Sequence, residues 1–336
     1  MLYYKISQKS KNKIILALDF KSIPKKDIFA LYKSKNQSSP KVSKIHNIIL
    51  FAFIFLLLFK NTSQENYIGI KVNAANENQI ISEQYNNVPT TVKVGSNSVT
   101  ITNKKIPVSS PNLLIKLFWS RNFDNFSYMF NGLTNIIYAE LSGMFNLNKI
   151  YLSYMFAHCT NLISVKILDD DIEYIVNMQG MFYNCVSLKS VYFQTSNPRV
   201  SLNYIDLSYM FYNCKNFITF GINIYNFKVS NAREMFYNCI SLGSFIFSPY
   251  LVSSPIDMSK MFYNCKAITH IEFSINYCKN RNCGTNSYFQ PTDMSFMFYN
   301  CNSLVSLTFN CLYTDNTKYM SYMLYNCKRL TKELQL

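Results

Sequence analysis

The sequence predicts an α/β repeat fold, a solenoid with a parallel β-sheet on one face and short helical turns on the other. Three observations lead to this prediction. The dipeptide Met-Phe recurs about every 26 residues, a Cys follows most of these Met residues at a fixed distance, and two apolar residues separated by a single residue follow the Cys. We expect such a chain to stack its repeats, because one short repeat cannot bury its apolar side alone.

The repeats are defined by their Met residues, which lie 26, 26, 29, 25, 26, 36 and 26 residues apart. This spacing gives about eight repeats of roughly 26 residues. The residues are Met129, Met155, Met181, Met210, Met235, Met261, Met297 and, in a Met-Leu dipeptide, Met323.

Within each repeat, the spacing of apolar residues changes from a helical to an extended period. A Cys lies four residues and an apolar residue seven residues after the Met, as with Met181, Cys185 and Leu188. These intervals place the three side chains on one face of a helical turn. Apolar residues ten and twelve positions after the Met, such as Val191 and Phe193, alternate as in a strand. Each repeat therefore predicts a helical turn followed by a short strand.

The repeat unit M-F-Y-N-C-x-S-L, followed by its alternating apolar pair, resembles the BspA-like leucine-rich repeats of microbial and protist surface proteins. The resemblance covers residues 126 to 333 approximately. It implies a leucine-rich-repeat-like right-handed solenoid on an exported protein that is associated with adhesion. It implies no catalytic residues.

Composition and charge divide the chain into four predicted parts. Residues 1–47 form a basic N-terminal tail, and residues 48–59 are twelve consecutive apolar residues that read as a signal-peptide h-region or a signal anchor. Residues 60–120 are expected to form an N-terminal cap or linker, and residues 121–336 the solenoid. The lysines before the apolar segment place the N-terminus in the cytoplasm, so the repeats are predicted to be extracellular or at the cell surface, on a single-pass membrane protein if the segment is not cleaved.

The formal charge of +15 does not by itself indicate nucleic-acid binding. Twelve lysines and two aspartates in residues 1–60 account for +10 of it, and the remaining residues carry a net charge of +5 without runs. We therefore expect no nucleic-acid partner. The expected partners are an extracellular protein or glycan, together with the membrane if residues 48–59 remain attached.

The cysteines of the repeat are expected to be buried as free thiols, because equivalent positions of a stacked repeat point into the core. Disulfides between adjacent repeats are the alternative. Cys278 and Cys283 lie in a ten-residue insertion outside this pattern, and we expect a local disulfide between them, with two exposed or semi-buried thiols as the alternative. No metal-ligand spacing, cofactor motif or catalytic motif is found, so we expect no metal, no cofactor and no enzyme activity. The expected buried Cys ladder is Cys159, Cys185, Cys214, Cys239, Cys265, Cys301 and Cys327.

Two regions are candidate binding surfaces. The first is the open face of the sheet, formed by residues nine and eleven positions after each Met: Ser164, Lys166, Ser190, Tyr192, Thr219, Ser244, Ile246, His270, Glu272, Ser306 and Thr308. An equally valid interpretation is that small residues there only allow close packing. The second is the insertion loop, with Lys279, Arg281, Asn282, Tyr288 and Phe289, for which tolerated sequence drift is the alternative.

These observations predict an exported or surface-anchored, non-catalytic repeat protein for adhesion or for protein or glycan binding. The alternative is a structural surface-coat protein whose repeats pack laterally without a specific ligand.

Overall fold

The computed structural model describes residues 66–120, 123–142, 149–168, 174–193, 203–221, 228–249, 251–252, 255–274, 290–310 and 312–331. The chain divides into two units, Met1–Ser63 and Gln64–Leu336, and all described residues belong to the second unit. The predicted basic tail and apolar segment lie outside the described residues. Within the described part, no helix is long and apolar enough to cross a membrane.

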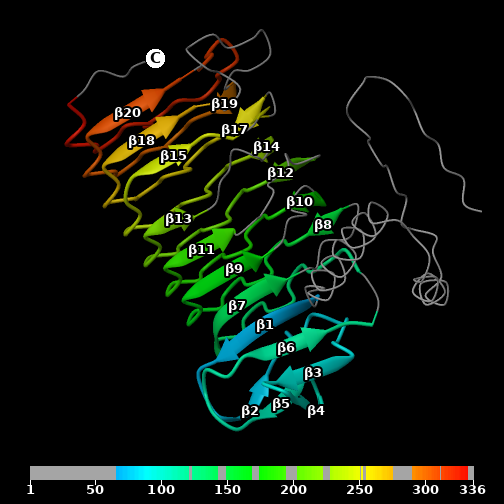
Figure 1. Ribbon diagram of the computed structural model, residues 1–336. Helices are drawn as coiled ribbons and strands as arrows, with labels where there is room; N and C mark the ends of the chain where they lie inside the picture. Colours follow the sequence, from blue (N-terminus) through cyan, green and yellow to red (C-terminus); the bar gives the residue numbers. More distant parts are fainter. Residues whose placement is uncertain are drawn as a thin grey trace, which may run out of the picture. The chain divides into compact units, whose positions relative to one another are not determined.

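The secondary structure of the described residues consists of short strands (Figure 1). In chain order, the strands are β1 (Tyr67–Val72), β2 (Asn76–Gln79), β3 (Thr91–Val94), β4 (Asn97–Val99), β5 (Lys105–Val108), β6 (Ile115–Phe118), β7 (Ile136–Ser142), β8 (Ile150–Tyr151), β9 (Ser164–Leu168), β10 (Ile175–Asn177), β11 (Ser190–Phe193), β12 (Tyr204–Asp206), β13 (Thr219–Gly221), β14 (Lys228–Asn231), β15 (Phe245–Phe247), β16 (Leu251–Val252), β17 (Ile256–Asp257), β18 (His270–Phe273), β19 (Pro291–Asp293) and β20 (Ser306–Phe309).

The repeats stack into a β-solenoid, in which each repeat forms one rung consisting of a strand, a Met-Phe turn and a second strand. The strands before the turns form a parallel sheet in the order β16-β14-β12-β10-β8, and β17 pairs with β19. The strands after the turns form the parallel ladders β7-β9-β11-β13 and β15-β18-β20. In these ladders, residues at equivalent repeat positions face each other, as Val191 faces Val165.

The predicted α/β class was wrong, because the Met-Phe segment forms no helix. Met155 N–H donates to the carbonyl of Leu152 within its own rung, at 3.2 Å, whereas Phe156 N–H donates to Met181 of the next rung, at 2.9 Å. Ala157 and His158 repeat this alternation. A helix requires each N–H to bond to the carbonyl four residues earlier, so this pattern is a series of β-turns.

Two positions of every turn have left-handed backbone conformation, which a right-handed helix excludes. In the second rung these are Tyr154, with φ of 53°, and His158, with φ of 61°. The second position is Asn in most rungs, a residue that tolerates this conformation. The spacing of four and three residues between Met, Cys and Leu is therefore compatible with a chain of turns as well as with a helix. The left-handed Asn residues are Asn184, Asn213, Asn238, Asn264, Asn300 and Asn326.

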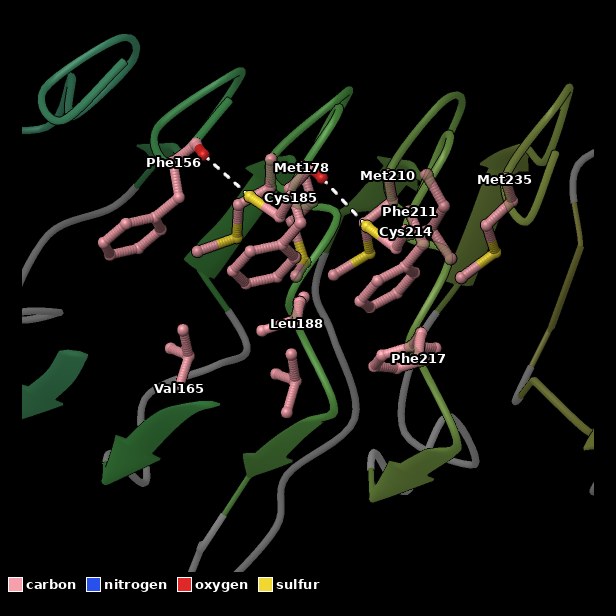
Figure 2. Packing of buried hydrophobic residues seen from close by; sticks show 14 of the residues in the cluster. Phe156, Val165, Met178, Cys185, Leu188, Met210, Phe211, Cys214, Phe217 and Met235 are labelled. Carbon is pink, nitrogen blue, oxygen red and sulfur yellow. Dashed lines mark hydrogen bonds between the residues drawn. The ribbon is translucent and has the colours of Figure 1, made fainter. Parts of the chain in front are cut away.

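The core lies between the Met-Phe turns and the strands that follow them (Figure 2). The Met, Phe and Leu residues of each repeat form columns that are fully or almost fully buried in the central rungs. Phe rings of neighbouring rungs stack, with centroids 5.4 Å apart between Phe182 and Phe211 and again between Phe211 and Phe236. Apolar burial thus runs continuously along the stack and supplies the main stabilisation.

Residues 66–120 form β-structure that joins the solenoid. Strand β1 pairs antiparallel with β7 on one side and with β6 on the other, and β6 continues to β3 and β4. The result is an eight-stranded sheet in the order β13-β11-β9-β7-β1-β6-β3-β4. The edge of β7 that the first rung leaves without a preceding repeat is therefore paired rather than open.

Gly180 provides a test of the turn geometry. It has φ of 56°, and a Cβ atom at this position would lie 2.3 Å from the ring of Tyr154. We expect Gly180→Ala to lower the free energy of unfolding by about 1–3 kcal/mol, because it adds left-handed strain and displaces a stacked ring. Urea unfolding measures this.

The matched control is Gly243→Ala, where a Cβ atom meets nothing within 4 Å. It should be neutral or slightly stabilising. Equal losses in the two variants would contradict the turn geometry described above.

Candidate binding surface

The predicted binding face is divided between two sheets. Ser164, Ser190 and Thr219 face one another in the eight-stranded sheet, and Lys166 faces Tyr192 beside them. The side chain of Thr219 lies outside the description. In the three-stranded sheet, His270 faces Ser306, whereas Ile246, Glu272 and Thr308 form a row. Ser244 precedes β15, and its hydroxyl lies 3.2 Å from that of Thr269.

The predicted insertion loop lies outside the described residues. This applies to its candidate binding residues Lys279, Arg281, Asn282, Tyr288 and Phe289, and to Cys278 and Cys283.

The repeat cysteines lie in the core as free thiols, fully buried except for Cys327, which is half-buried. Each thiol donates a hydrogen bond to the carbonyl of the Met-Phe phenylalanine in the preceding rung; Cys185 Sγ lies 2.9 Å from Phe156 O (Figure 2). Burial raises the pKa of Cys159 to about 12 and that of Cys327 to about 11. Thiols that stay protonated are poor nucleophiles and poor metal ligands. The described residues contain no cluster of three or more metal-ligating side chains.

The turns also carry a tyrosine column and, in the left-handed Asn residues, an asparagine column, and both are half-buried except at the exposed Tyr325. The tyrosine column is Tyr183, Tyr212, Tyr237, Tyr263, Tyr299 and Tyr325. The Tyr rings stack almost in parallel, with centroids 4.6 Å apart between Tyr212 and Tyr237. The Asn amides bond to one another, as Asn238 Nδ2 donates to Asn213 Oδ1 at 2.7 Å. Each inner ring therefore has its faces covered by its neighbours, and the amides satisfy each other, so these columns serve stacking rather than ligand contact.

A charged cluster on the turns is balanced internally. Arg233 contacts Glu234 at 3.2 Å and Asp257 at 3.5 Å, and Lys260 lies 3.7 Å from Glu234. Two cations and two carboxylates thus offset each other, which leaves little net field for an external partner.

The outer face of the eight-stranded sheet has a different character. Its strands bury one alternating set of side chains, including Ile68, Ile70, Val165 and Ile167, and turn the other set outward. Register pairing places seven outward positions, one on each strand from β3 to β13, in a single row across the sheet. This outer row consists of Lys93, Lys116, Gly69, Glu140, Lys166, Tyr192 and Gly221.

Lysines and aromatic rings alternate around the outer row. Lys116 Nζ lies 4.1 Å from the ring centroid of Tyr67, and Lys93 Nζ lies 4.9 Å from that of Phe118. Lys71 Nζ lies 5.2 Å from the ring centroid of Tyr138. These cation–π contacts hold the ammonium groups close to the sheet while their charge remains.

Glu140 occupies the centre of the outer row. Its two carboxylate oxygens accept hydrogen bonds from the hydroxyls of Tyr67 and Tyr138, both at 2.7 Å. The side chain lies over Gly69, where a Cβ atom would be 2.7 Å from Glu140 Cγ. Burial and the bond to Glu140 raise the pKa of Tyr138, so its hydroxyl remains a donor at neutral pH.

A shallow depression lies beside the same rungs, formed by the residue after β1, the start of β7 and the residues that lead into β9, β11 and β13. Its volume is about 370 Å³, and it combines amide, hydroxyl and cationic groups with exposed aliphatic side chains. The lining residues are Asn73, Ile137, Asn161, Ile163, Ser187, Lys189 and Asn216.

The repeats also define the family. The family model for "Mycoplasma protein of unknown function, DUF285" matches residues 109–217, 150–277 and 205–336, which together span more than half of the chain. The chain belongs to the DUF285 family. No curated protein and no solved structure matches it. The overlapping DUF285 matches follow the stacked rungs, and they begin within the segment that leads into β6.

Sequence reasoning found only the solenoid half of this surface. Lys166 and Tyr192 were predicted as outward residues, but Lys93, Lys116 and Glu140 were not. A signal for the N-terminal cap, residues 66–120, did exist, because Ile68, Ile70 and Val72 alternate with Gly69 and Lys71 as in a half-buried strand. No local sequence pattern, however, indicates which strands this segment pairs with.

The buried thiols predict loss of stability at alkaline pH. In the unfolded chain their pKa has its ordinary value of 9.0, whereas Cys159 has a folded pKa of about 12. Above pH 9 the unfolded chain releases protons that the folded chain retains, so unfolding becomes more favourable as pH rises. The stability that the buried, protonated thiol of Cys159 contributes is complete below pH 9 and is lost as pH rises toward 12. Urea unfolding between pH 8 and pH 11 measures it.

Each such thiol should contribute a slope of about 1.4 kcal/mol per pH unit. Cys239→Ala removes one fully buried thiol whose pKa is raised and should make the slope shallower by about this amount. A wild-type stability that stays constant up to pH 11 would contradict the burial of these thiols.

Proposed function

We propose that this DUF285 protein is an exported or surface-anchored, non-catalytic binding protein that contacts extracellular protein or glycan ligands. The observation that carries the proposal is the outer face of the eight-stranded sheet, where cationic, aromatic and hydroxyl side chains share one surface that is exposed at Lys166 and Tyr192 and partly exposed elsewhere. The resemblance of its repeats to BspA-like surface proteins supports the same function. A structural surface coat is the competing outcome of the tests below.

The outer face is favoured as the binding surface because the other repeat side chains are occupied by contacts within the stack. Met, Phe, Cys and Leu side chains fill the interior of the rungs, and the Tyr and Asn columns bond among themselves. The outer face instead leaves Tyr192 with 47% of its surface exposed and Lys166 exposed beside it. Aromatic and cationic residues of this kind dominate the energetics of protein recognition.

We expect Tyr192→Ala to weaken ligand binding by about tenfold or more, since exposed tyrosines at binding centres contribute about 1–3 kcal/mol. The full chain is first screened on protein and glycan arrays, and affinities for the ligands found are then measured for the variants. Tyr204→Ala is the matched control, because Tyr204 is 46% exposed but lies on β12 of the other sheet. Equal affinity of both variants would move binding away from the outer face.

Export is tested separately. Because the lysines before residues 48–59 favour a cytoplasmic N-terminus, protease added to intact cells should digest the repeats. A tag placed after Leu336 should be lost in parallel. Protection of that tag until the cells are lysed would contradict the proposed topology. Deletion of residues 126–336 should reduce the attachment of cells to other cells or to matrix. An altered surface coat together with normal cell attachment would favour the structural alternative.

A further inference from the structure

The cationic character of the outer face is specific to one sheet. The strands of the eight-stranded sheet carry four lysines, Lys71, Lys93, Lys116 and Lys166, and a single carboxylate, Glu140. The three-stranded sheet β15-β18-β20 has no lysine or arginine within its strands and carries Glu272. Within the described strands, the eight-stranded sheet therefore carries an excess of positive charge, which attracts anions.

The outer row crosses most of the eight-stranded sheet. Its seven positions lie on consecutive strands of one sheet, from Lys93 on β3 to Gly221 on β13. Because neighbouring strands lie about 4.8 Å apart, the row extends roughly 29 Å. The depression beside it, at the starts of β9 and β11, is open and shallow. A small anion would contact one or two of these side chains, whereas an extended polymer laid across the strands contacts all of them.

The uncharged groups of the outer face match sugar hydroxyls. Ser164 and Ser190 face each other in the row next to Lys166 and Tyr192. Tyr192 itself is 47% exposed. An exposed ring beside hydroxyl groups suits a sugar, whose apolar ring face packs on the aromatic ring while its hydroxyls form hydrogen bonds.

Two features disfavour a nucleic acid. The rings of Tyr67, Phe118 and Tyr138 each have a lysine ammonium over them, so they do not offer a stacking platform for bases. Glu140 also interrupts the lysines in the middle of the outer row. A backbone with a phosphate on every unit would place an anion against this carboxylate, whereas a chain whose charged sugars are separated by neutral sugars need not.

We propose that the outer row binds a linear acidic polysaccharide in which carboxylated sugars alternate with neutral sugars. Lys93 and Lys116 bind one carboxylate, Lys166 binds the next, and a neutral sugar crosses Glu140 between them. This inference rests on the proposed binding function and assigns its ligand class.

The experiment measures the affinity of the full chain for hyaluronan oligosaccharides, with dextran and single-stranded oligo-dT as competing probes. We expect hyaluronan to bind and dextran not to bind. The double variant Lys116→Gln/Lys166→Gln should weaken binding about tenfold or more and reduce the slope of log affinity against log salt by about two. Lys318→Gln, an exposed lysine outside the outer row, should leave both unchanged.

Glu140→Gln is expected to strengthen hyaluronan binding, whereas the lysine variant weakens it. The amide still accepts a hydrogen bond from one tyrosine and donates one to the other, so the sheet is retained while a negative charge is removed. Hyaluronan binding should become a few-fold tighter. Circular dichroism and thermal unfolding check that each variant keeps the fold.

The outcomes separate the two proposals. Binding of an array ligand through Tyr192 together with no affinity for hyaluronan would overturn the acidic polysaccharide and leave the binding function standing. Oligo-dT binding tighter than hyaluronan would identify the outer row as a nucleic-acid surface and overturn the inference. No ligand on any array and attachment unchanged by deletion of residues 126–336 would remove the binding function itself.

Discussion

In each Met-Phe turn, successive backbone N–H groups alternate between a carbonyl of their own rung and a carbonyl of the next rung. This alternation lets a turn stack on its copy as a strand pairs with a strand, because every second residue is available for pairing between rungs. It requires left-handed conformation at two positions, shown by Tyr209 and Asn213 in the fourth rung. The sequence meets the requirement with Asn or Gly at the second of them in most rungs.

Stacking of identical turns explains why the repeat keeps its residue types. A Phe carbonyl that accepts the Cys N–H of its own rung also accepts the thiol of the next rung, as Phe156 does from Cys159 and Cys185. A side chain at that position must be small, nearly apolar and able to donate a weak hydrogen bond, and Cys meets all three conditions. The Tyr and Asn columns follow the same logic, since each residue binds its own copy. The recurrence of the same residue types from turn to turn in this chain therefore follows from contacts between stacked turns.

The extent to which the sequence predicted this molecule depends on the range of the interactions concerned. The repeat period, the register of Val165 with Val191 and the outward direction of Lys166 all follow from periodicity, which acts within a repeat or between adjacent repeats. The helical turn was predicted wrongly because apolar spacing of four and three residues does not distinguish a helix from chained β-turns. Only the preference of Asn for left-handed backbone carried that information. The pairing of β1 with β7 brings residues about 70 positions apart into register, and no local pattern specifies such a contact.

That long-range pairing is also what makes the outer row continuous. Lys93 and Lys116 come from the cap, Lys166 and Tyr192 from the solenoid, and the bonds from Tyr67 and Tyr138 to Glu140 lie at the boundary between them. A repeat array without its cap would retain Lys166 but lose Lys71, Lys93 and Lys116, three of the four lysines, and would expose an unpaired β7 edge. The cap therefore closes the stack and completes the charged surface through the same strand pairing. Its sheet register thus links the stability of the first rung to the function that we propose.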